Sequence, residues 1–331
     1  MNLKDVLLRQ LISAQKTEGF ISGEELAEQC NISRTAVWKA VNALRKQGAK
    51  IEAVTNRGYR LIDSEIFNAE AVNAKLPVNS GVKIEFFKSI DSTNTEAKRR
   101  LALVPQGELH KTVFVAAMQT AGRGRLTGRT FYSPPDTGIY LSLVWNNGNI
   151  AAPAKITAVA AVAVCRALKN IYNADPKIKW VNDIYIGEKK VCGILTEGTA
   201  NFESGRIESA IIGIGVNISA DGMPDNLKNI AGGVIKSGEK MKRSDLTAAI
   251  ITEIVELLDG GEIKTAEAMQ EYKSRSNLIG KKITVSPVIG ENRTDYTATA
   301  TGITDEAKLE VRLSDGTVKY LDSGEVSLHT D

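Results

Sequence analysis

Histidine and cysteine are scarce in this sequence of 331 residues, and their scarcity argues against several kinds of catalytic site. The histidines are His110 and His329, and the three cysteines, Cys30, Cys165 and Cys192, form no motif. A structural zinc site needs about four such ligands, and a serine-histidine-aspartate triad needs a histidine beside its nucleophile. We therefore expect catalysis to use Arg, Lys, Asp, Asn and backbone groups, and the cysteines to be reduced, apolar fillers of a cytoplasmic protein.

The sequence also lacks an export or membrane segment. The first ten residues, MNLKDVLLRQ, carry charges where a signal peptide has its apolar core. The most apolar run, residues 156–165, lies between Lys155 and Arg166 and is too short to span a bilayer, so we expect a buried helix there. The length indicates two or three domains in a folded, soluble protein.

Two common nucleotide-binding motifs are absent as well. Neither GRGRLTGR (122–129) nor GIGVNI (213–218) fits G-x-G-x-x-G, and G-x-x-x-x-G-K-[ST] does not occur. The sequence therefore does not predict a dinucleotide-binding Rossmann unit or a P-loop.

The first sixty residues predict a winged helix-turn-helix. Residues 3–15 have helical apolar spacing, Ser22 begins a second helix in a capping box with Glu25, and Ser33 caps a third helix that ends at Gly48. Residues 49–62 then alternate like a hairpin that turns near Asn56–Gly58. The inward faces are predicted to hold Val6, Leu7, Leu11, Ile12, Val37, Ala40, Val41 and Leu44. Three helices followed by a hairpin is the order of a winged helix-turn-helix.

Charge supports a DNA-binding role for this region. Residues 1–32 hold three bases against five acids, whereas residues 33–60 hold seven bases against Glu52 alone. The positive charge thus falls on the third helix and the hairpin, where phosphates would lie. A protein-interaction module with a solvated basic face is the alternative. The predicted DNA contacts are Ser33, Arg34, Thr35, Trp38, Lys39, Arg45 and Arg57.

From Val82 onward, short apolar strands alternate with helices, which predicts an α+β domain on a mixed sheet. The segment before it, residues 63–81, has no strong strand or helix period and contains Pro77, so we place a domain boundary near residue 64. Residues 273–331 are a run of short strands, and Asp315-Gly316 predicts a hairpin turn between two of them.

An arginine loop, QTAGRGRLTGR (119–129), is the most distinctive motif of the central region. Three arginines and three glycines occur there without an acid, so the loop repels itself until an anion binds. Glycines let backbone N–H groups approach a ligand, and guanidinium groups match phosphate or carboxylate oxygens. A disordered segment and a non-specific RNA contact are the alternatives.

Other polar motifs have a structural and a functional interpretation. Ser92, Thr93 and Asn94 in DSTN either bind a polar ligand at a strand end or cap a helix, with Thr93 and Glu96 in capping-box spacing. Asn182-Asp183 in KWVND suits a turn, and Lys190 begins the next strand. GIGVNI reads as a buried strand with one polar residue, Asn217, at its end.

In this order, the winged helix, DSTN, QTAGRGRLTGR, KWVND, KKVCGIL and GIGVN resemble the bifunctional biotin protein ligases that also repress a biotin operon. The resemblance covers nearly the whole chain, and GRGR, KWxND and a lysine seven residues after that Asp are specific to biotin ligases. It implies an α+β multidomain fold: a winged helix-turn-helix (1–63), a mixed-sheet ligase domain (64–272) and a small SH3-like β-barrel (273–331).

The resemblance implies that biotin and ATP, with Mg²⁺, form biotinyl-5′-adenylate, and that biotin passes to one lysine of a carboxylase carrier domain. It further implies a ligand-dependent homodimer that binds operator DNA. Two alternatives remain open. One is a repressor whose enzyme domain only senses ligand, and the other is a lipoate or octanoate ligase.

The matching motifs imply a role for each site residue. The biotin site would comprise Ser92, Thr93, Asn94, Gln119, Gly122, Arg123, Gly124, Arg125 and Lys190. The nucleotide site would comprise Arg125, Arg129, Phe131, Asn182 and Asn217. Catalysis would depend on Arg123, Arg125, Lys190 and Asp183, with Mg²⁺ near Asp183 and Asn217. Asp183 would either contact the metal or help to deprotonate the acceptor lysine.

The chain departs from the family pattern at three positions. The arginine loop has one extra residue before Gly128, and Phe131 stands where the family has Trp. His329 stands where better-known repressor-type members have Arg. The first two departures bear on how the loop closes.

Overall fold

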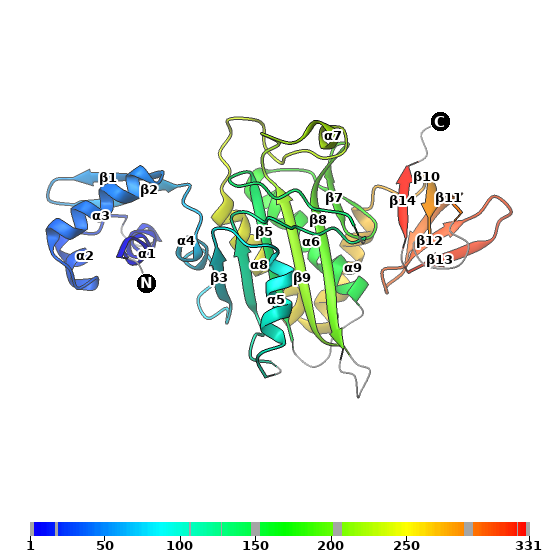
Figure 1. Cartoon of the computed structure of the whole chain (residues 1–331), viewed down its shortest axis with the longest axis horizontal. Helices are drawn as coiled ribbons and strands as arrows, with labels where there is room; N and C mark the ends of the chain where they lie inside the picture. Colours follow the sequence, from blue (N-terminus) through cyan, green and yellow to red (C-terminus); the bar gives the residue numbers. More distant parts are fainter. Residues whose placement is uncertain are drawn as a thin grey trace. The chain divides into compact units, whose positions relative to one another are not determined.

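The computed structural model describes residues 3–16, 19–105, 107–126, 128–146, 153–200, 207–287, 294–322 and 324–328. The chain forms two compact units, one of Met1–Ser80 with Lys240–Ala249 and one of Gly81–Glu239 with Ile250–Asp331 (Figure 1). The three domain ranges predicted from the resemblance divide the chain differently and stay a prediction.

The first unit begins with the predicted three helices and hairpin. These elements are α1 (Leu3–Lys16), α2 (Gly23–Gln29), α3 (Arg34–Lys46), β1 (Ala49–Val54) and β2 (Gly58–Ser64). Ser22 and Glu25 cap α2 reciprocally, and the Ser33 side chain accepts the Ala36 N–H, as the sequence predicted. The hairpin turns at Asn56 and Gly58, both with positive φ. A Cβ on Gly58 would lie 2.2 Å from the Ile21 carbonyl oxygen, so this close approach requires glycine.

The core of this unit lies between the helices and the hairpin. The α3 stripe is buried as predicted, and so are Leu7, Leu11 and Ile12 of α1, whereas Val6 is only half-buried and Leu8 is buried in addition. The opposite face of α3 is open to solvent, and the Trp38 side chain there is 57% exposed. Trp38, one of the predicted DNA contacts, is therefore accessible on this face.

A short helix, α4 (Ala69–Asn73), follows the hairpin, within the segment 63–81 in which the sequence shows no strong period. One and a half turns are too few to show a period, but the Asn68 side chain accepts the Ala71 N–H at 2.8 Å and caps the helix. Residues 240–249 belong to the same unit, where the Ser244 hydroxyl donates to the Ile66 carbonyl at 2.8 Å.

The second unit contains a seven-stranded mixed sheet, as predicted, in the order β3-β4-β5-β9-β8-β7-β6. Only β3 and β4 are parallel, and all other neighbours in this sheet are antiparallel. The strands are β3 (Lys83–Phe87), β4 (Thr112–Ala116), β5 (Gly138–Trp145), β6 (Lys177–Lys179), β7 (Asp183–Ile186), β8 (Lys189–Ala200) and β9 (Ile207–Asn217).

Helices cover both faces of this sheet (Figure 1). On one face, α5 (Thr93–Leu101) packs on β4, β5 and β9. On the other face, α6 (Pro153–Tyr172) packs on β8 and β9, and α9 (Gly261–Ser274) packs on α6. The apolar run 156–165 lies within α6 and is buried, which confirms the predicted buried helix. The remaining helices are α7 (Asp225–Lys228) and α8 (Arg243–Asp259).

The C-terminal part of the second unit is an antiparallel sheet in the order β13-β12-β11-β10-β14. Its strands are β10 (Lys282–Ser286), β11 (Tyr296–Ile303), β12 (Leu309–Arg312), β13 (Val318–Leu321) and β14 (Glu325–Leu328). The hairpin turn predicted at Asp315-Gly316 is present, with Gly316 at φ +86°. Among the described strands no pairing joins β13 to β14, so a closed barrel stays a prediction.

All three cysteines are free thiols, as expected, and burial raises the pKa of Cys165 to about 12. Within the described ranges no helix has both the length and the apolar character needed to cross a membrane.

Candidate active site

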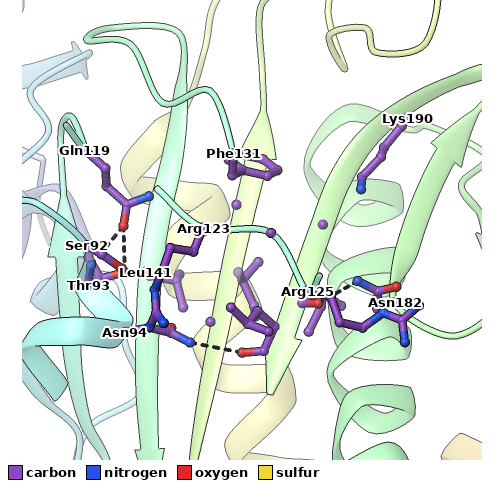
Figure 2. A pocket seen from close by; sticks show the side chains of 17 residues that line it. Ser92, Thr93, Asn94, Gln119, Arg123, Arg125, Phe131, Leu141, Asn182 and Lys190 are labelled. Atoms are coloured by element: carbon purple, nitrogen blue, oxygen red, sulfur yellow. Dashed lines mark hydrogen bonds between the residues drawn. The ribbon is translucent and has the colours of Figure 1, made fainter. Parts of the chain in front are cut away.

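An open cleft on the second unit gathers the motifs that the sequence singled out. It encloses about 500 Å³ free of protein atoms when the open solvent at its mouth is included. Its walls come from the start of α5, the arginine loop, β5, β8 and β9 (Figure 2). The predicted site residues that line it are Ser92, Thr93, Asn94, Gln119, Arg123, Gly124, Arg125, Phe131, Asn182 and Lys190.

One end of the cleft is a neutral polar cluster where DSTN meets Gln119 (Figure 2). The Thr93 N–H and hydroxyl donate to Gln119 Oε1 at 2.9 and 3.1 Å. Ser92, and not Thr93, is the N-cap of α5, since Ser92 Oγ accepts the Thr95 N–H at 3.4 Å. The capping box expected at Thr93 is therefore wrong by one residue, and that shift leaves the Thr93 hydroxyl facing the cleft cluster.

A buried serine, Ser142, organises this cluster and was missed by sequence reasoning. Its hydroxyl lies 2.7 Å from Thr93 Oγ1 and 2.5 Å from Asn94 Oδ1, and its side chain is fully buried in β5. The hydroxyl holds one proton, so it can donate to only one of these two oxygens. The available signal was a single polar residue inside the otherwise apolar strand GIYLSLVW.

The arginine loop forms a hairpin. The Gly124 N–H donates to the Arg129 carbonyl at 2.8 Å, and the Phe131 N–H donates to the Gly122 carbonyl at 2.9 Å. A Cβ on Gly122 would lie 2.5 Å from the Phe131 carbonyl oxygen, so glycine is required where the two arms approach. The stretch in which this chain has its extra residue includes Thr127, which lies outside the described residues.

Two arginines of the loop already have protein partners. Arg123 Nη2 lies 3.1 Å from Glu197 Oε2 on β8, and Arg125 Nη2 donates to the Gly324 carbonyl next to β14. Glu197 is a second residue that the sequence did not reveal, because nothing local in "TEGTA" links it to a loop seventy residues earlier. The loop thus contacts both sheets of this unit through guanidinium groups.

Glycines on β8 and β9 form the floor of the cleft. A Cβ on Gly215 would lie 2.5 Å from the Phe131 ring, and a Cβ on Gly213 would lie 2.2 Å from Asn94 Oδ1. The two glycines of GIGVNI therefore make room for two side chains of the site. This buried strand and its polar end at Asn217 agree with the sequence prediction.

The other end of the cleft is cationic, and Figure 2 shows Arg125 and Lys190 there on the side opposite Thr93 and Gln119. Lys190 Nζ lies 2.7 Å from Asp183 Oδ1, near enough for an ion pair, although that buried oxygen accepts no hydrogen bond. Asn182 beside it is held by β8, since its Nδ2 donates to the Ile194 carbonyl at 2.9 Å.

Four predicted site residues do not line the cleft: Gly122, Arg129, Asp183 and Asn217. Gly122 and Asp183 still contact lining residues, whereas Asn217 pairs with Gly138 at the end of β9. Within the described ranges no three or more His, Cys, Asp and Glu side chains gather as metal ligands. A bound cation would therefore depend on oxygen atoms supplied by a ligand.

The predicted DNA contacts lie on the first unit. Ser33, Arg34, Thr35, Trp38 and Lys39 are exposed at the start of α3. Two other predicted contacts interact with the protein. Arg45 donates to the Ile51 carbonyl at 2.8 and 3.1 Å, and the Arg57 guanidinium lies 4.3 Å from the centre of the Phe20 ring.

Three regions of the chain match known protein families. Residues 86–217, which include every residue lining the cleft, match the Biotin/lipoate A/B protein ligase family. Residues 7–60 match an HTH domain family, and residues 279–329 match the Biotin protein ligase C terminal domain.

Curated relatives match most or nearly all of the chain. The chain is 36% identical over 263 residues to the bifunctional ligase/repressor BirA of Bacillus spizizenii, covering 75% of this chain and 77% of that protein. It is 28% identical over 328 residues to BirA of Escherichia coli, covering 97% of each. The structure of the Aquifex aeolicus biotin protein ligase in complex with biotin and ATP matches with a TM-score of 0.61 at 27% identity, covering 75% of this chain and 99% of that one.

Proposed function

The chain belongs to the family of bifunctional ligase/repressor proteins, and on this premise we propose that its cleft holds biotinyl-5′-adenylate between the polar cluster and Lys190. It is a biotin protein ligase that uses ATP, and it carries the DNA-binding domain of a repressor. The observation that supports the proposed pose is the asymmetry of the cleft: uncharged Thr93, Asn94 and Gln119 line one end, where Arg123 is paired with Glu197, and Arg125 and Lys190 line the other end (Figure 2).

Biotin matches this polarity because its urea ring is neutral and its tail ends in a carboxylate. The urea group needs both donors and acceptors, which Ser92, Thr93, Asn94 and Gln119 can supply. Ser92 Oγ accepts the Thr95 N–H, which leaves its own O–H to donate to the urea oxygen. The carboxylate then points along the arginine loop toward Lys190.

In the first step, a carboxylate oxygen of biotin attacks the α-phosphorus of ATP, and the bond from that phosphorus to pyrophosphate breaks. Both reactants are anionic, so the barrier includes their repulsion. Arg125 and Lys190 provide fixed positive charge where negative charge develops, while Arg123, paired with Glu197, lines the cleft nearer the polar cluster. No covalent enzyme intermediate is needed, in keeping with the absence of a nucleophile–histidine pair in the cleft lining.

Mg²⁺ fits these residues only as a companion of the nucleotide. One carboxylate, Asp183, is near the cationic end, and its Oδ1 is buried without a hydrogen bond. Magnesium is commonly held by one or two carboxylates together with substrate phosphates. Asp183 would be its protein ligand, with the Asn182 side chain nearby, and the ion would screen the phosphate charge.

In the second step, the amine of an acceptor lysine attacks the biotinyl carbonyl carbon, and AMP leaves. The mixed anhydride is also open to water, so the arginine hairpin must cover it until the acceptor arrives. Arg125 contacts the Gly324 carbonyl, which brings the C-terminal sheet to the edge of this loop. We propose that this sheet is the SH3-like barrel of the family and that it assists nucleotide and acceptor binding.

For the repressor role, we propose that α3 enters a major groove through its exposed start, including Arg34, Trp38 and Lys39. We further propose that adenylate binding promotes a homodimer and so raises affinity for operator DNA. Sedimentation with and without biotin plus ATP tests the dimer, and a monomer under both conditions would exclude it.

The enzyme is tested by adenylate formation, read by mass, with ATP, Mg²⁺ and either biotin or lipoate. We expect pyrophosphate and biotinyl-adenylate with biotin, and disappearance of the adenylate when a biotin-acceptor domain is added. Formation of lipoyl-adenylate in preference to biotinyl-adenylate would indicate a lipoate ligase. If neither adenylate forms, the chain is better interpreted as a DNA-binding protein that senses biotin.

A further inference from the structure

Glu197 on β8 joins two parts of the molecule that border the cleft, although it does not itself line the cleft. Its Oε1 accepts from Lys98 Nζ at 2.7 Å, and its Oε2 accepts from Asn94 Nδ2 at 2.8 Å and from Arg123 Nη2 at 3.1 Å. Asn94 and Lys98 belong to α5, whereas Arg123 belongs to the arginine loop. One carboxylate therefore ties the loop to the helix that carries the polar cluster.

The surroundings of the Glu197 carboxylate favour its charged form. Its side chain is only 20% exposed, and this burial opposes ionisation. The hydrogen bonds from Lys98 and Asn94 and the positive charge of Arg123 outweigh burial, so the pKa of Glu197 lies below its ordinary value. At neutral pH Glu197 is an anion with three donors around it.

The contact reaches the cleft through Arg123. The Arg123 side chain lines the cleft, and its backbone pairs with Thr130 across the loop hairpin. A change in the position of its guanidinium group therefore moves both a wall of the cleft and one arm of the hairpin. Charge-assisted hydrogen bonds are the stronger kind, so the pair with Glu197 is a substantial attachment of the loop to the sheet.

We propose that Glu197 is a positioning residue that acts through Arg123, holding the arginine loop closed so that bound adenylate is not lost to water before transfer. This inference rests on the proposed function. Without Glu197, Arg123 loses the carboxylate that balances its charge, and the open form of the loop gains population. Water then reaches the anhydride more often.

The test compares Glu197→Gln with a matched control, Lys98→Met. The Gln variant still accepts from Asn94 but loses charge pairing with Arg123, whereas the Met variant removes the other ion pair of the same carboxylate and leaves Arg123 paired. The measured quantity is the ratio of free biotin plus AMP to biotin transferred to an acceptor domain. Urea midpoints of both variants report on folding.

We expect Glu197→Gln to raise this ratio about tenfold, the scale of one charge-assisted hydrogen bond, and Lys98→Met to stay within about twofold. Equal ratios in the two variants, or no rise in Glu197→Gln, would overturn the inference.

Trypsin cleavage after the loop arginines of the ligand-free proteins gives an independent measurement. Faster cleavage is expected in Glu197→Gln only, and equal cleavage contradicts the inference. If the unaltered protein makes no adenylate, the proposed function fails, while the cleavage rates still decide the role of Glu197.

Discussion

The Phe131 ring lies on the backbone of Gly215, so closely that a Cβ on residue 215 would fall 2.5 Å from a ring carbon. Gly215 is the direct partner of Gly193 on the neighbouring strand, where a Cβ would lie 3.2 Å from the same ring. The ring edge also faces Tyr140, with centroids 6.4 Å apart and planes at 71°. Two facing glycines thus form a flat seat for an aromatic ring at the floor of the cleft.

This seat predicts the effect of Gly215→Ala. The added methyl group displaces the Phe131 ring, because a Cβ at residue 215 would lie 2.5 Å from a ring carbon, far inside van der Waals contact. Overpacking of this kind costs about 1–3 kcal/mol, so we expect KM for ATP to rise about tenfold with smaller change in KM for biotin. Steady-state kinetics measures both. Gly198→Ala is the control, since it lies on β8 outside the cleft and meets only the Ile207 side chain at 3.2 Å.

Substitutions of Lys190 and of Asp183 should change different kinetic quantities. Lys190→Met removes a cation from the reacting centre and leaves Asp183 without its ion pair, so single-turnover adenylate formation should fall about 100-fold or more. Asp183→Asn keeps the lysine charge, and its main effect should be a higher Mg²⁺ concentration for half-maximal rate. An unchanged Mg²⁺ requirement in Asp183→Asn would remove Asp183 as the metal contact.

The sequence predicts helix caps and turns well because these depend on residues close together in the chain. The Ser22–Glu25 cap, the turn at Asn56–Gly58 and the Asp315-Gly316 hairpin follow from side chains within a few residues of the backbone they stabilise. The short helix α4 was not predicted because its five residues are too few to show a helical period.

The cleft was predictable only in part, since its remaining residues depend on strand order. Ser142 and Glu197 reach the polar cluster and the arginine loop because β5, β9 and β8 are neighbours in the sheet, an order that no local pattern encodes. Arginines 123 and 125 were predicted to meet a ligand, but their protein partners, Glu197 and the Gly324 carbonyl, were not. Long-range pairing supplies these contacts.

DNA binding gives a prediction for Lys39 on the exposed face of α3. If Lys39 contacts a phosphate, Lys39→Ala should weaken binding to a random-sequence duplex and reduce the slope of log affinity against log salt by about 0.9. Lys169→Ala, which removes an equal charge from an exposed position on the second unit, is the control. Equal slopes for both variants would place the DNA interface elsewhere.

Arg57 and Arg60 of the β1–β2 hairpin both contact the Phe20 ring, and this contact gives a second prediction for DNA binding. The Arg57 and Arg60 guanidinium groups lie 4.3 and 4.6 Å from the Phe20 ring centre, and Arg60 is also paired with Glu52 at 2.6 Å. Phe20→Leu removes the ring that orients Arg57, and a cation–π contact at an exposed site is worth about 0.5–1 kcal/mol. We expect two- to fivefold weaker duplex binding, roughly, with unchanged biotin ligation. Loss of ligation as well would indicate a folding defect instead.

His110 should make the stability of the second unit depend on pH. Its Nδ1 accepts the Asn146 N–H at 3.0 Å, and its ring meets Trp145 edge-on with centroids 4.6 Å apart. Burial, with the positive charge of Lys111, lowers the pKa of His110 below its ordinary value, against a smaller opposing effect of Asp259. The folded protein therefore keeps this histidine neutral to a lower pH than the unfolded chain does.

The sign of the effect follows from the unfolded chain, where histidine titrates near pH 6.5. Above that pH both states are neutral, and the stability from His110 is fully present. As the pH falls below it, the unfolded state takes up the proton first, so stability decreases until the lowered folded pKa is passed. Urea midpoints between pH 8 and pH 5 should therefore fall in the unaltered protein and fall less in His110→Gln. A variant of His329, the other histidine of the sequence, shows which of the two carries the dependence, and an unchanged slope in His110→Gln would exclude His110 as its source.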